Sequence, residues 1–336
     1  TGGTITDNGK TEECPTPYIT FKAEGAQTFK MTAQNGYEIS GLEYSVNNGK
    51  WENVENGNPV TFGGDKGDLR LRGINPNGTA NSSSNYSTIT FTNPKVNVAC
   101  TGNILTLLDW RNYNIVETNN ARFCYLFYNC RVLTSAPELP ATKLADNCYF
   151  GMFHGCTKLT SAPVLPATTL AERCYYAMFW DCTSLTSAPV LPATKLAESC
   201  YNSMFDGCTS LKSAPELPAK KLADYCYYEM FRDCTSLTSA PKLSAIELAE
   251  SCYSSMFYGC ENLLSVTMLA PSDKIKNTSY SFNRWLDKAG TKATTRTLIV
   301  TDEAAYNELE TNSDYLPAIW KKDATNTTVK YYTPKP

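Results

Sequence analysis

Apolar and polar positions follow two different patterns along this chain. Between residues 18 and 91, short stretches place apolar side chains at every second position, which is typical of half-buried β-strands. Residues 47–50, Asn-Asn-Gly-Lys, have the composition of a hairpin turn. We therefore expect residues 15–100 to form a small all-β sandwich of immunoglobulin-like type. The expected strands are 18–23, 29–32, 42–46, 69–72 and 88–91.

The middle of the chain has a period of 26 residues. The segment Cys-Tyr-x-x-Met-Phe-x-x-Cys begins at residues 148, 174, 200, 226 and 252. A fixed period of this length predicts stacked units that bury their apolar faces against each other. Equivalent positions keep the same apolar residue, as in the Leu column from Leu133 to Leu263 and the Phe column from Phe127 to Phe257. These columns predict continuous apolar ladders.

The second half of each unit has the spacing of a helix. Leu170, Cys174, Met178 and Cys182 follow one another at i+4, which predicts an amphipathic helix with an acidic residue in its first turn and Gly or Asp at its end. The first half, Leu-Thr-Ser-Ala-Pro, predicts a short strand that ends at proline. Since helices need more room than strands, the stack is expected to curve into an α/β horseshoe, with short parallel strands on the concave side and helices on the convex side.

The unit Cys-Thr-Ser-Leu-Thr-Ser-Ala-Pro, followed by Met-Phe-x-x-Cys, resembles the BspA-type leucine-rich repeat over roughly residues 104–290. It departs from the usual unit in its greater length and in Ala, Pro and Met at three positions. The resemblance implies a leucine-rich-repeat solenoid in a surface or secreted protein of anaerobic bacteria, often lipid-anchored. It also implies adhesion or host-protein binding, proposed for some relatives, and no catalytic residues.

The expected organisation has four parts. Residues 1–14 form a flexible leader, 15–100 the sandwich, 101–290 the solenoid and 291–336 a C-terminal cap. We expect the last repeat to have a helix around Phe282, Trp285 and Leu286, and the cap to contain a strand at 297–300 and a helix near 304–309. The chain begins with polar residues and without a signal-peptide pattern, so we expect a processed or trimmed form. We expect a cell-surface or secreted location, as an outer-membrane lipoprotein whose N-terminal lipid anchor is absent from this chain.

Twelve of the 14 cysteines lie in the repeat region: six in the column from Cys130 to Cys260, five in the column from Cys148 to Cys252, and Cys124 outside both. The eight-residue spacing within a unit is unlike that of zinc-ligand pairs, and it exceeds the reach of a disulfide if the segment is helical. Packing as small buried hydrophobes is the favoured interpretation, and disulfides between units remain open. A bridge between Cys14 and Cys100 is also left open.

Charge and residue chemistry point away from catalysis and nucleic acid. The net charge is −3, so we expect no nucleic-acid partner. The only histidine, His154, shares its column with Trp180, Asp206, Arg232 and Tyr258, and this variety predicts a solvent-facing position. We therefore expect no catalytic residue, no cofactor and no metal, although a pair of carboxylates as in glycosidases is not excluded by count.

Columns that vary between units are the candidates for binding. One column lies beside the predicted strand, a second lies at its start, and the third is the column of His154. A non-enzymatic adhesion or binding protein for a protein or glycan is the leading hypothesis, and a structural spacer without a ligand is the alternative. The candidate partner-binding residues are Glu138, Val164, Val190, Glu216 and Lys242 in the first column, with Thr186 and Lys212 in the second.

Overall fold

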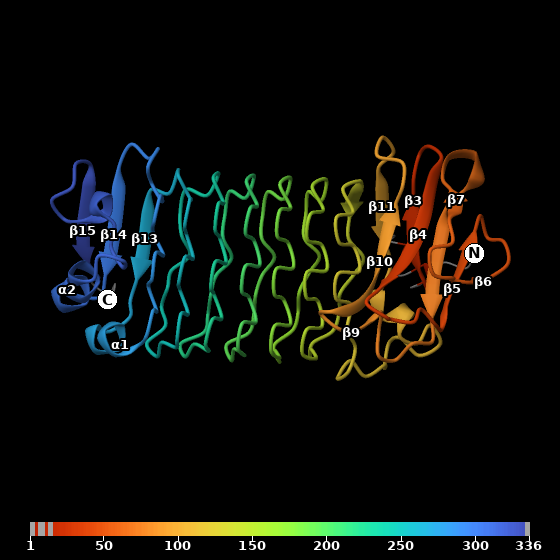
Figure 1. Ribbon diagram of the computed structural model, residues 1–336, viewed down its shortest axis with the longest axis horizontal. Coiled ribbons are helices and arrows are strands. Elements are labelled where there is room, and N and C mark those ends of the chain that lie inside the picture. The colour runs from red at the N-terminus through yellow and green to blue at the C-terminus, as the bar shows by residue number, and fades with distance from the viewer. Residues whose placement is uncertain (1–3, 6–10, 13–15, 333–336) are drawn as a thin grey trace.

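The computed structural model describes residues 4–5, 11–12 and 16–332 and shows an elongated molecule (Figure 1). Two sheets lie at the N-terminal end, a row of similar coils forms the middle, and a small sheet with two helices lies at the C-terminal end. A separate two-stranded ribbon pairs β1 (Thr4–Ile5) with β2 (Thr11–Glu12).

The N-terminal sheets are almost entirely antiparallel. The four-stranded sheet has the order β7-β4-β10-β9, and the six-stranded sheet has the order β12-β11-β3-β8-β5-β6. All five stretches that alternate in the sequence lie on strands, so those strand predictions are confirmed. The bounds are β3 (Ile19–Lys22), β4 (Gln27–Gln34), β5 (Leu42–Val46), β6 (Glu52–Asn53), β7 (Val60–Phe62), η1 (Gly64–Lys66), β8 (Leu69–Gly73), β9 (Ala80–Ser82), β10 (Asn85–Phe91), β11 (Val98–Thr101) and β12 (Leu133–Ser135).

The turn between β5 and β6 is the predicted hairpin turn. Asn47 and Asn48 have φ values of 50° and 58°, and the N–H of Gly49 donates to the carbonyl of Val46 at 2.9 Å. Asparagine tolerates this left-handed backbone better than most residues, which explains why the turn is readable from the sequence.

The second half of each unit is not a helix. Alternate N–H groups donate to the carbonyl three residues earlier, as Met152 does to Tyr149 at 3.2 Å. The N–H groups between them donate to the next coil, as Phe153 does to Met178 at 2.9 Å. An α-helix would instead bond every N–H to the residue four earlier in its own segment. Each of these segments is therefore a ribbon of consecutive turns that shares half of its hydrogen bonds with its neighbour.

Left-handed residues at every fourth position produce this ribbon. In one coil Arg173, Ala177 and Asp181 have φ values of 53°, 51° and 56°, and the equivalent residues of the other repeated coils are also positive. Such a backbone costs a non-glycine residue about 1–2 kcal/mol, which the hydrogen bonds between coils must offset. The acidic residue predicted in the first turn of each helix has another role here, which is to link coils. The Asp146 carboxylate accepts a hydrogen bond from the N–H of Glu172 in the next coil at 3.1 Å.

The α/β horseshoe prediction is wrong. Among the described residues there are two short α-helices, α1 (Ser272–Asn277) and α2 (Glu303–Thr311), and neither lies in the repeated coils. Main-chain hydrogen bonds join neighbouring coils on the turn side, and bridges such as Ser187 with Ser213 join them on the extended side. Because both sides keep the strand-like spacing, no mismatch bends the stack, and the coils follow one another in a nearly straight row (Figure 1).

The predicted apolar ladders are confirmed. The Phe rings from Phe127 to Phe257 stack at centroid distances of 5.5–5.8 Å with interplanar angles of 3–7°. The Tyr rings from Tyr149 to Tyr253 form a second buried ladder at 5.7–5.9 Å. Equal side chains stack well here because hydrogen bonds hold successive coils in register.

The cysteines of the repeats are free and buried. In the column that runs from Cys130 to Cys260, Cys130 donates from its Sγ to the Ile89 carbonyl at 3.2 Å, and each later Sγ donates to the Phe carbonyl of the preceding coil, as Cys208 does to Phe179 at 3.1 Å. Equivalent bonds are made by Cys156, Cys182, Cys234 and Cys260. The structure thus supports packing as thiols, with hydrogen bonding added to it. Cys100 is also a free buried thiol, and Cys14 lies outside the described residues.

Both ends of the stack are closed by different structures. At the N-terminal end β12, which starts the second coil, pairs in parallel with β11, so the six-stranded sheet continues into the repeats. One apolar core extends through the sheets and the coils to Trp320. The domain boundaries stay predictions. The first coil contains η2 (Ile104–Leu107).

At the C-terminal end a parallel sheet has the order β13-β14-β15. The predicted strand at 297–300 and the predicted helix near 304–309 are confirmed as β14 and α2. The predicted helix around Phe282, Trp285 and Leu286 is wrong, since these buried residues lie in turns. The remaining bounds are β13 (Ser265–Met268), β14 (Arg296–Val300), η3 (Ala318–Trp320) and β15 (Thr327–Tyr331).

One column of left-handed positions alternates between an Asn or Asp and glycine. Its members are Asn129, Gly155, Asp181, Gly207, Asp233 and Gly259. A Cβ at Gly207 would overlap Oδ1 of Asp181 in the coil before it, and the same relation holds for the pairs 129/155 and 233/259. Each Asn or Asp side chain therefore occupies the space that the neighbouring glycine leaves.

We predict that Gly207→Ala destabilises the protein by about 1–3 kcal/mol, because alanine meets Asp181 and adopts a left-handed φ. In the background of Asp181→Gly the same change should cost less, since only the backbone term remains. Urea unfolding of the two single variants and the double variant measures the difference as a coupling free energy. Equal costs in both backgrounds would contradict the packing explanation.

The buried thiols predict a loss of stability at high pH. Burial raises the pKa of Cys130 from its ordinary value of 9.0 to about 12, and the same cause raises that of Cys200 to about 12. An unfolded chain releases these protons above pH 9 while the folded chain keeps them, so the free energy of unfolding should fall as pH rises from 9 to 12. One such thiol accounts for up to about 4 kcal/mol.

Circular dichroism of unfolding at stepped pH measures this fall. At pH 8 the folded protein should leave its repeat cysteines unmodified by an aromatic disulfide reagent, and the guanidinium-unfolded chain should react fully. Rapid modification of the folded protein, or constant stability up to pH 11, would refute the thiol assignment.

Candidate functional site

The candidate column beside the predicted strand is exposed. We call the surface formed by the exposed residues of segments 133–140, 159–166, 185–192, 211–218 and 237–244 the extended face. On it Val164 and Val190 are 79% and 78% exposed, in adjacent coils. Glu138 and Glu216 are exposed at the same position in the coils on either side of this pair. The column thus consists of two exposed valines between two carboxylates.

Lys242, the last residue of that column, has a partner within the chain. Its Nζ donates to the Tyr332 hydroxyl at 2.8 Å and lies 4.5 Å from the centre of the tyrosine ring. Part of its hydrogen-bonding capacity is therefore already used by the C-terminal segment. Among the candidate residues, Lys242 is the one that contacts the C-terminal segment and helps to hold it in place.

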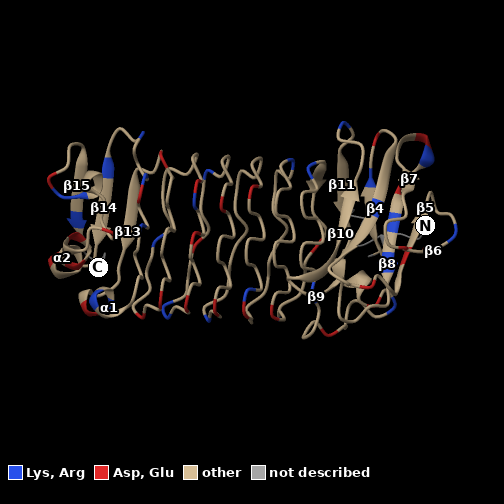
Figure 2. Cartoon of the chain, viewed as in Figure 1, with Lys and Arg blue, Asp and Glu red and all other residues tan. Residues whose placement is uncertain are grey.

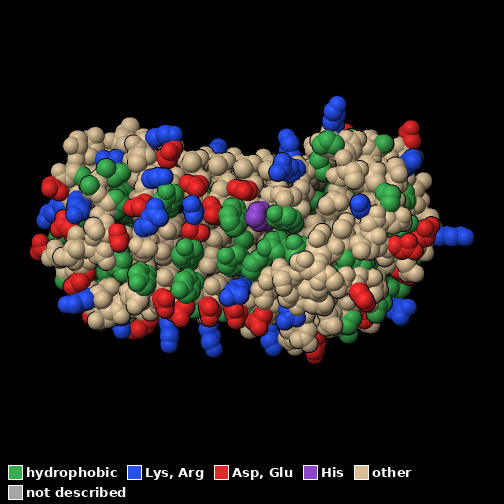
Figure 3. Space-filling model, viewed as in Figure 1, with side chains coloured by type: hydrophobic (Ala, Val, Ile, Leu, Met, Phe, Trp, Pro, Cys, Tyr) green, Lys and Arg blue, Asp and Glu red, His purple; other side chains and the backbone are tan. Residues whose placement is uncertain are grey.

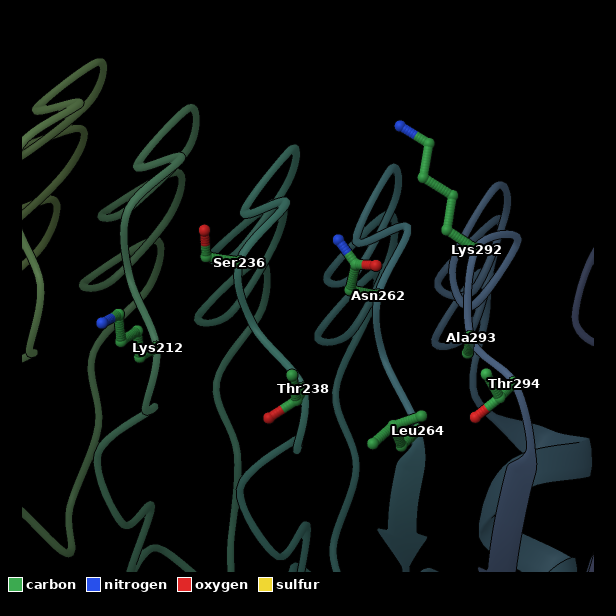
Figure 4. Close-up of a pocket in the computed structure, with 8 residues that line it drawn as sticks. All are labelled: Lys212, Ser236, Thr238, Asn262, Leu264, Lys292, Ala293 and Thr294. Carbon is green, nitrogen blue, oxygen red and sulfur yellow. The ribbon is translucent and has the colours of Figure 1, made fainter.

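Thr186 and Lys212 lie in a second, parallel row of the extended face and are both exposed. The N–H of Lys212 donates to the Thr186 carbonyl at 3.1 Å. Lys212 and Thr238 line an open hollow of about 560 Å³ that extends to Leu264 and the C-terminal sheet (Figure 4). Thr186 does not line this hollow, so the structure separates the two candidates.

A proline-lined hollow of about 430 Å³ lies beside Val164. We call this hollow, together with the exposed side chains of Val164 and Val190, the valine shelf. The hollow is lined mostly by apolar side chains: Ala136, Pro137, Leu139, Pro140, Pro163, Val164 and Pro166, with Glu138 as the charged member.

Glu138 also borders a polar hollow of about 580 Å³ against the N-terminal sheet. There β3 and β8 contribute Lys22 and Arg70, and Lys22 lies 3.8 Å from Asp68. The sequence analysis missed this hollow. The signal was available in Leu-Arg-Leu-Arg of β8, whose leucines are buried and whose arginines face outward.

A second missed feature joins the sheet to the first coil. The guanidinium of Arg72 lies between Trp51 and Trp110, 3.9 Å and 3.8 Å from their ring centres, and its Nε is 3.1 Å from the Glu43 carboxylate. Trp110 follows η2 in sequence, so no short-range pattern links it to Trp51. The cluster holds the two parts of the molecule together by cation–π contacts.

The column of His154 lies on the opposite surface of the coils, which we call the turn face and define by segments 145–156, 171–182, 197–208, 223–234 and 249–260. His154 lies among hydrophobic side chains near the middle of the molecule (Figure 3). Its ring is 5.0 Å from Tyr128 and 4.9 Å from Trp180. The predicted solvent-facing position is only half correct, since His154 is partly buried by these rings.

Farther along this column the residues become charged. Asp206 is buried, and desolvation raises its pKa from 3.8 to about 7, against the opposing effect of Arg232. Glu229, Asp233 and Asp181 add to the rise. Burial by the aromatic rings lowers the pKa of His154. Burial therefore favours the uncharged form of both Asp206 and His154.

Within the described residues no group of three or more His, Cys, Asp and Glu side chains is arranged to hold a metal ion. In the same part of the chain, no helix has the length and apolar character to cross a membrane. Acidic and basic residues are both spread over the coils (Figure 2).

Comparison with known proteins identifies the repeats. The family model described as BspA type leucine rich repeat region matches residues 123–248 and 151–286, with six copies. The repeat region of this chain belongs to the BspA-type leucine-rich repeat family. The resemblance noted in the sequence is thereby confirmed. Proteins with BspA-type repeats are often surface-associated or secreted, and the family is generally non-enzymatic. No curated protein and no solved structure matches the chain.

We predict that Asp206→Asn raises stability at pH 8 by on the order of 2 kcal/mol, because it removes a buried charge. The folded pKa of Asp206 lies above the unfolded value, so the aspartate disfavours folding only as pH rises from about 4 to about 7. Urea unfolding at pH 4 and pH 8 should show a difference from wild type at pH 8 alone. The exposed Glu216→Gln is the control, and an equal effect of D206N at both pH values would exclude this explanation.

Proposed function

We propose that this chain is a non-enzymatic binding protein of the bacterial cell surface or of secreted material, and that its valine shelf binds a protein partner. The supporting observation is the exposure of Val164 and Val190, at 79% and 78%, directly beside a proline-lined hollow. Burying a valine side chain contributes about 1.5 kcal/mol or more, so two neighbouring valines are a substantial source of affinity.

The shelf is rigid before a partner arrives. Proline fixes φ, and Pro163 and Pro166 flank Val164 and its neighbour Leu165, which is buried. Main-chain bonds to adjacent coils hold the segments at both ends. A rigid surface loses little conformational entropy on binding, which favours affinity for a given buried area.

The charges beside the shelf favour one kind of partner. Glu138 and Glu216 lie one coil beyond the valines on either side. Coils with strand-like spacing are about 4.8 Å apart, so the two carboxylates are separated by roughly 15 Å along the stack. A protein segment with apolar residues between two basic ones would complement this arrangement.

Retention on an array of purified extracellular-matrix proteins tests the proposal. Val164→Thr with Val190→Thr keeps the branched shape but removes the apolar surface, and it should weaken retention by about tenfold or more. Thr168→Val with Thr194→Val, at exposed positions of the same coils outside the candidate columns, is the matched control and should retain binding. Circular dichroism should show all these variants folded.

The alternative is a structural spacer without a ligand. It is favoured by the regular, nearly straight stack of coils that connects the two ends of the molecule (Figure 1). A spacer predicts a folded chain that retains no array protein. Retention that is unchanged in the threonine double variant would reject the valine shelf while keeping a binding function elsewhere.

A further inference from the structure

Another hollow lies on the turn face, away from the valine shelf. It has a volume of about 360 Å³ and lies between the turn after β9 and the coils. It is lined by three aromatic rings together with one basic, one acidic and three uncharged polar side chains. The lining residues are Phe150, Tyr176 and Tyr225, with Ser83, Arg173, Glu198, Ser199 and Asn202.

An aromatic ladder ends at this hollow. The rings of Phe150 and Tyr176 stack at 4.5 Å with an interplanar angle of 5°. In the next coil the same position is Asn202, so within the described residues Phe150 is the one ring that pairs with Tyr176. The second face of the Tyr176 ring has no aromatic partner in the described part of the chain, and the residue is partly exposed, so an apolar ligand surface can pack there.

Asn202 supplies a hydrogen-bond donor beside that ring face. The residue is 94% buried, and its Oδ1 accepts from the Ser203 hydroxyl at 2.8 Å. Among the described residues its Nδ2 has no hydrogen-bond partner, and it is not sealed from solvent either. A donor in so confined a place is satisfied best by a ligand oxygen in the hollow.

The remaining lining groups are balanced in charge. Arg173 is half-exposed and lies 3.5 Å from the Glu172 carboxylate, whereas Glu198 has no ion-pair partner in the described part of the chain. No net positive charge is present that would attract an acidic ligand. A donor, an acceptor and an amide around an aromatic ring instead suit a neutral molecule with many hydroxyl groups.

We propose that this hollow binds a neutral sugar residue of a glycan. The C–H face of the pyranose packs on Tyr176, one hydroxyl accepts from Nδ2 of Asn202, and others bond to Arg173 and Glu198. The volume is at the small end of ligand sites and suits one or two sugar residues. The proposal extends the binding role given above but uses the opposite face of the coils.

Saturation-transfer NMR on the full chain with maltose, cellobiose and lactose, each at millimolar concentration, tests this site. At least one disaccharide should receive saturation at its ring C–H protons. Tyr176→Ala and Asn202→Ala should each reduce the transfer by at least fivefold. Tyr228→Ala, in the same column but outside the hollow, should leave it unchanged, and glucuronic acid should show no stronger transfer than the neutral sugars.

Transfer to none of the three disaccharides would overturn the proposal, as would undiminished transfer in both the Tyr176 and Asn202 variants. Circular dichroism identifies a variant that fails to fold. If Tyr176→Ala does not fold, the transfer measured for Asn202→Ala, which removes no ring, decides whether the proposal stands. The threonine double variant of the valine shelf should keep sugar transfer. Failure of the sugar site and failure of the shelf are thus distinguishable.

Discussion

The hydrogen bonds between consecutive coils determine the rest of this structure. Every second N–H of the turn ribbon donates to the coil that follows, so neighbouring coils are held at one spacing along the turn side, and isolated bridges such as Ser187 with Ser213 join them on the extended side. The ladders of Phe, Tyr and Cys follow from that spacing, because identical side chains lie above one another. The straightness of the stack follows as well, since neither side is wider than the other.

The same constraint shapes the surfaces. A side chain on a coil is free to vary only if it does not enter the shared core, and two sets of such positions lie on opposite faces. The extended face carries isolated apolar and charged groups, including Val164 and Glu216, beside open hollows. On the turn face, rings such as Tyr176 stand beside small residues such as Asn202. A surface of this kind varies by single substitutions without altering the scaffold.

The sequence predicted the period, the buried columns and the N-terminal strands, because each depends on local spacing of apolar residues. It did not predict the turn ribbon. An i+4 pattern such as Leu170, Cys174 and Met178 suits a helix and also suits turns that repeat every four residues. The difference lies in the left-handed residues, and Arg173 and Ala177 give no compositional signal for that backbone. The exposed candidates were placed correctly in columns, whereas the hollow around Asn202 depends on segments far apart in the chain.

The alternation of Asn or Asp with glycine at positions 129 to 259 restricts how the array can gain or lose coils. Adjacent coils are not interchangeable, since a carboxylate placed above another carboxylate would crowd and repel it. The unit that duplicates without conflict is a pair of coils, 52 residues long, which is twice the 26-residue sequence period. Longer or shorter descendants of this array would therefore be expected to gain or lose coils two at a time.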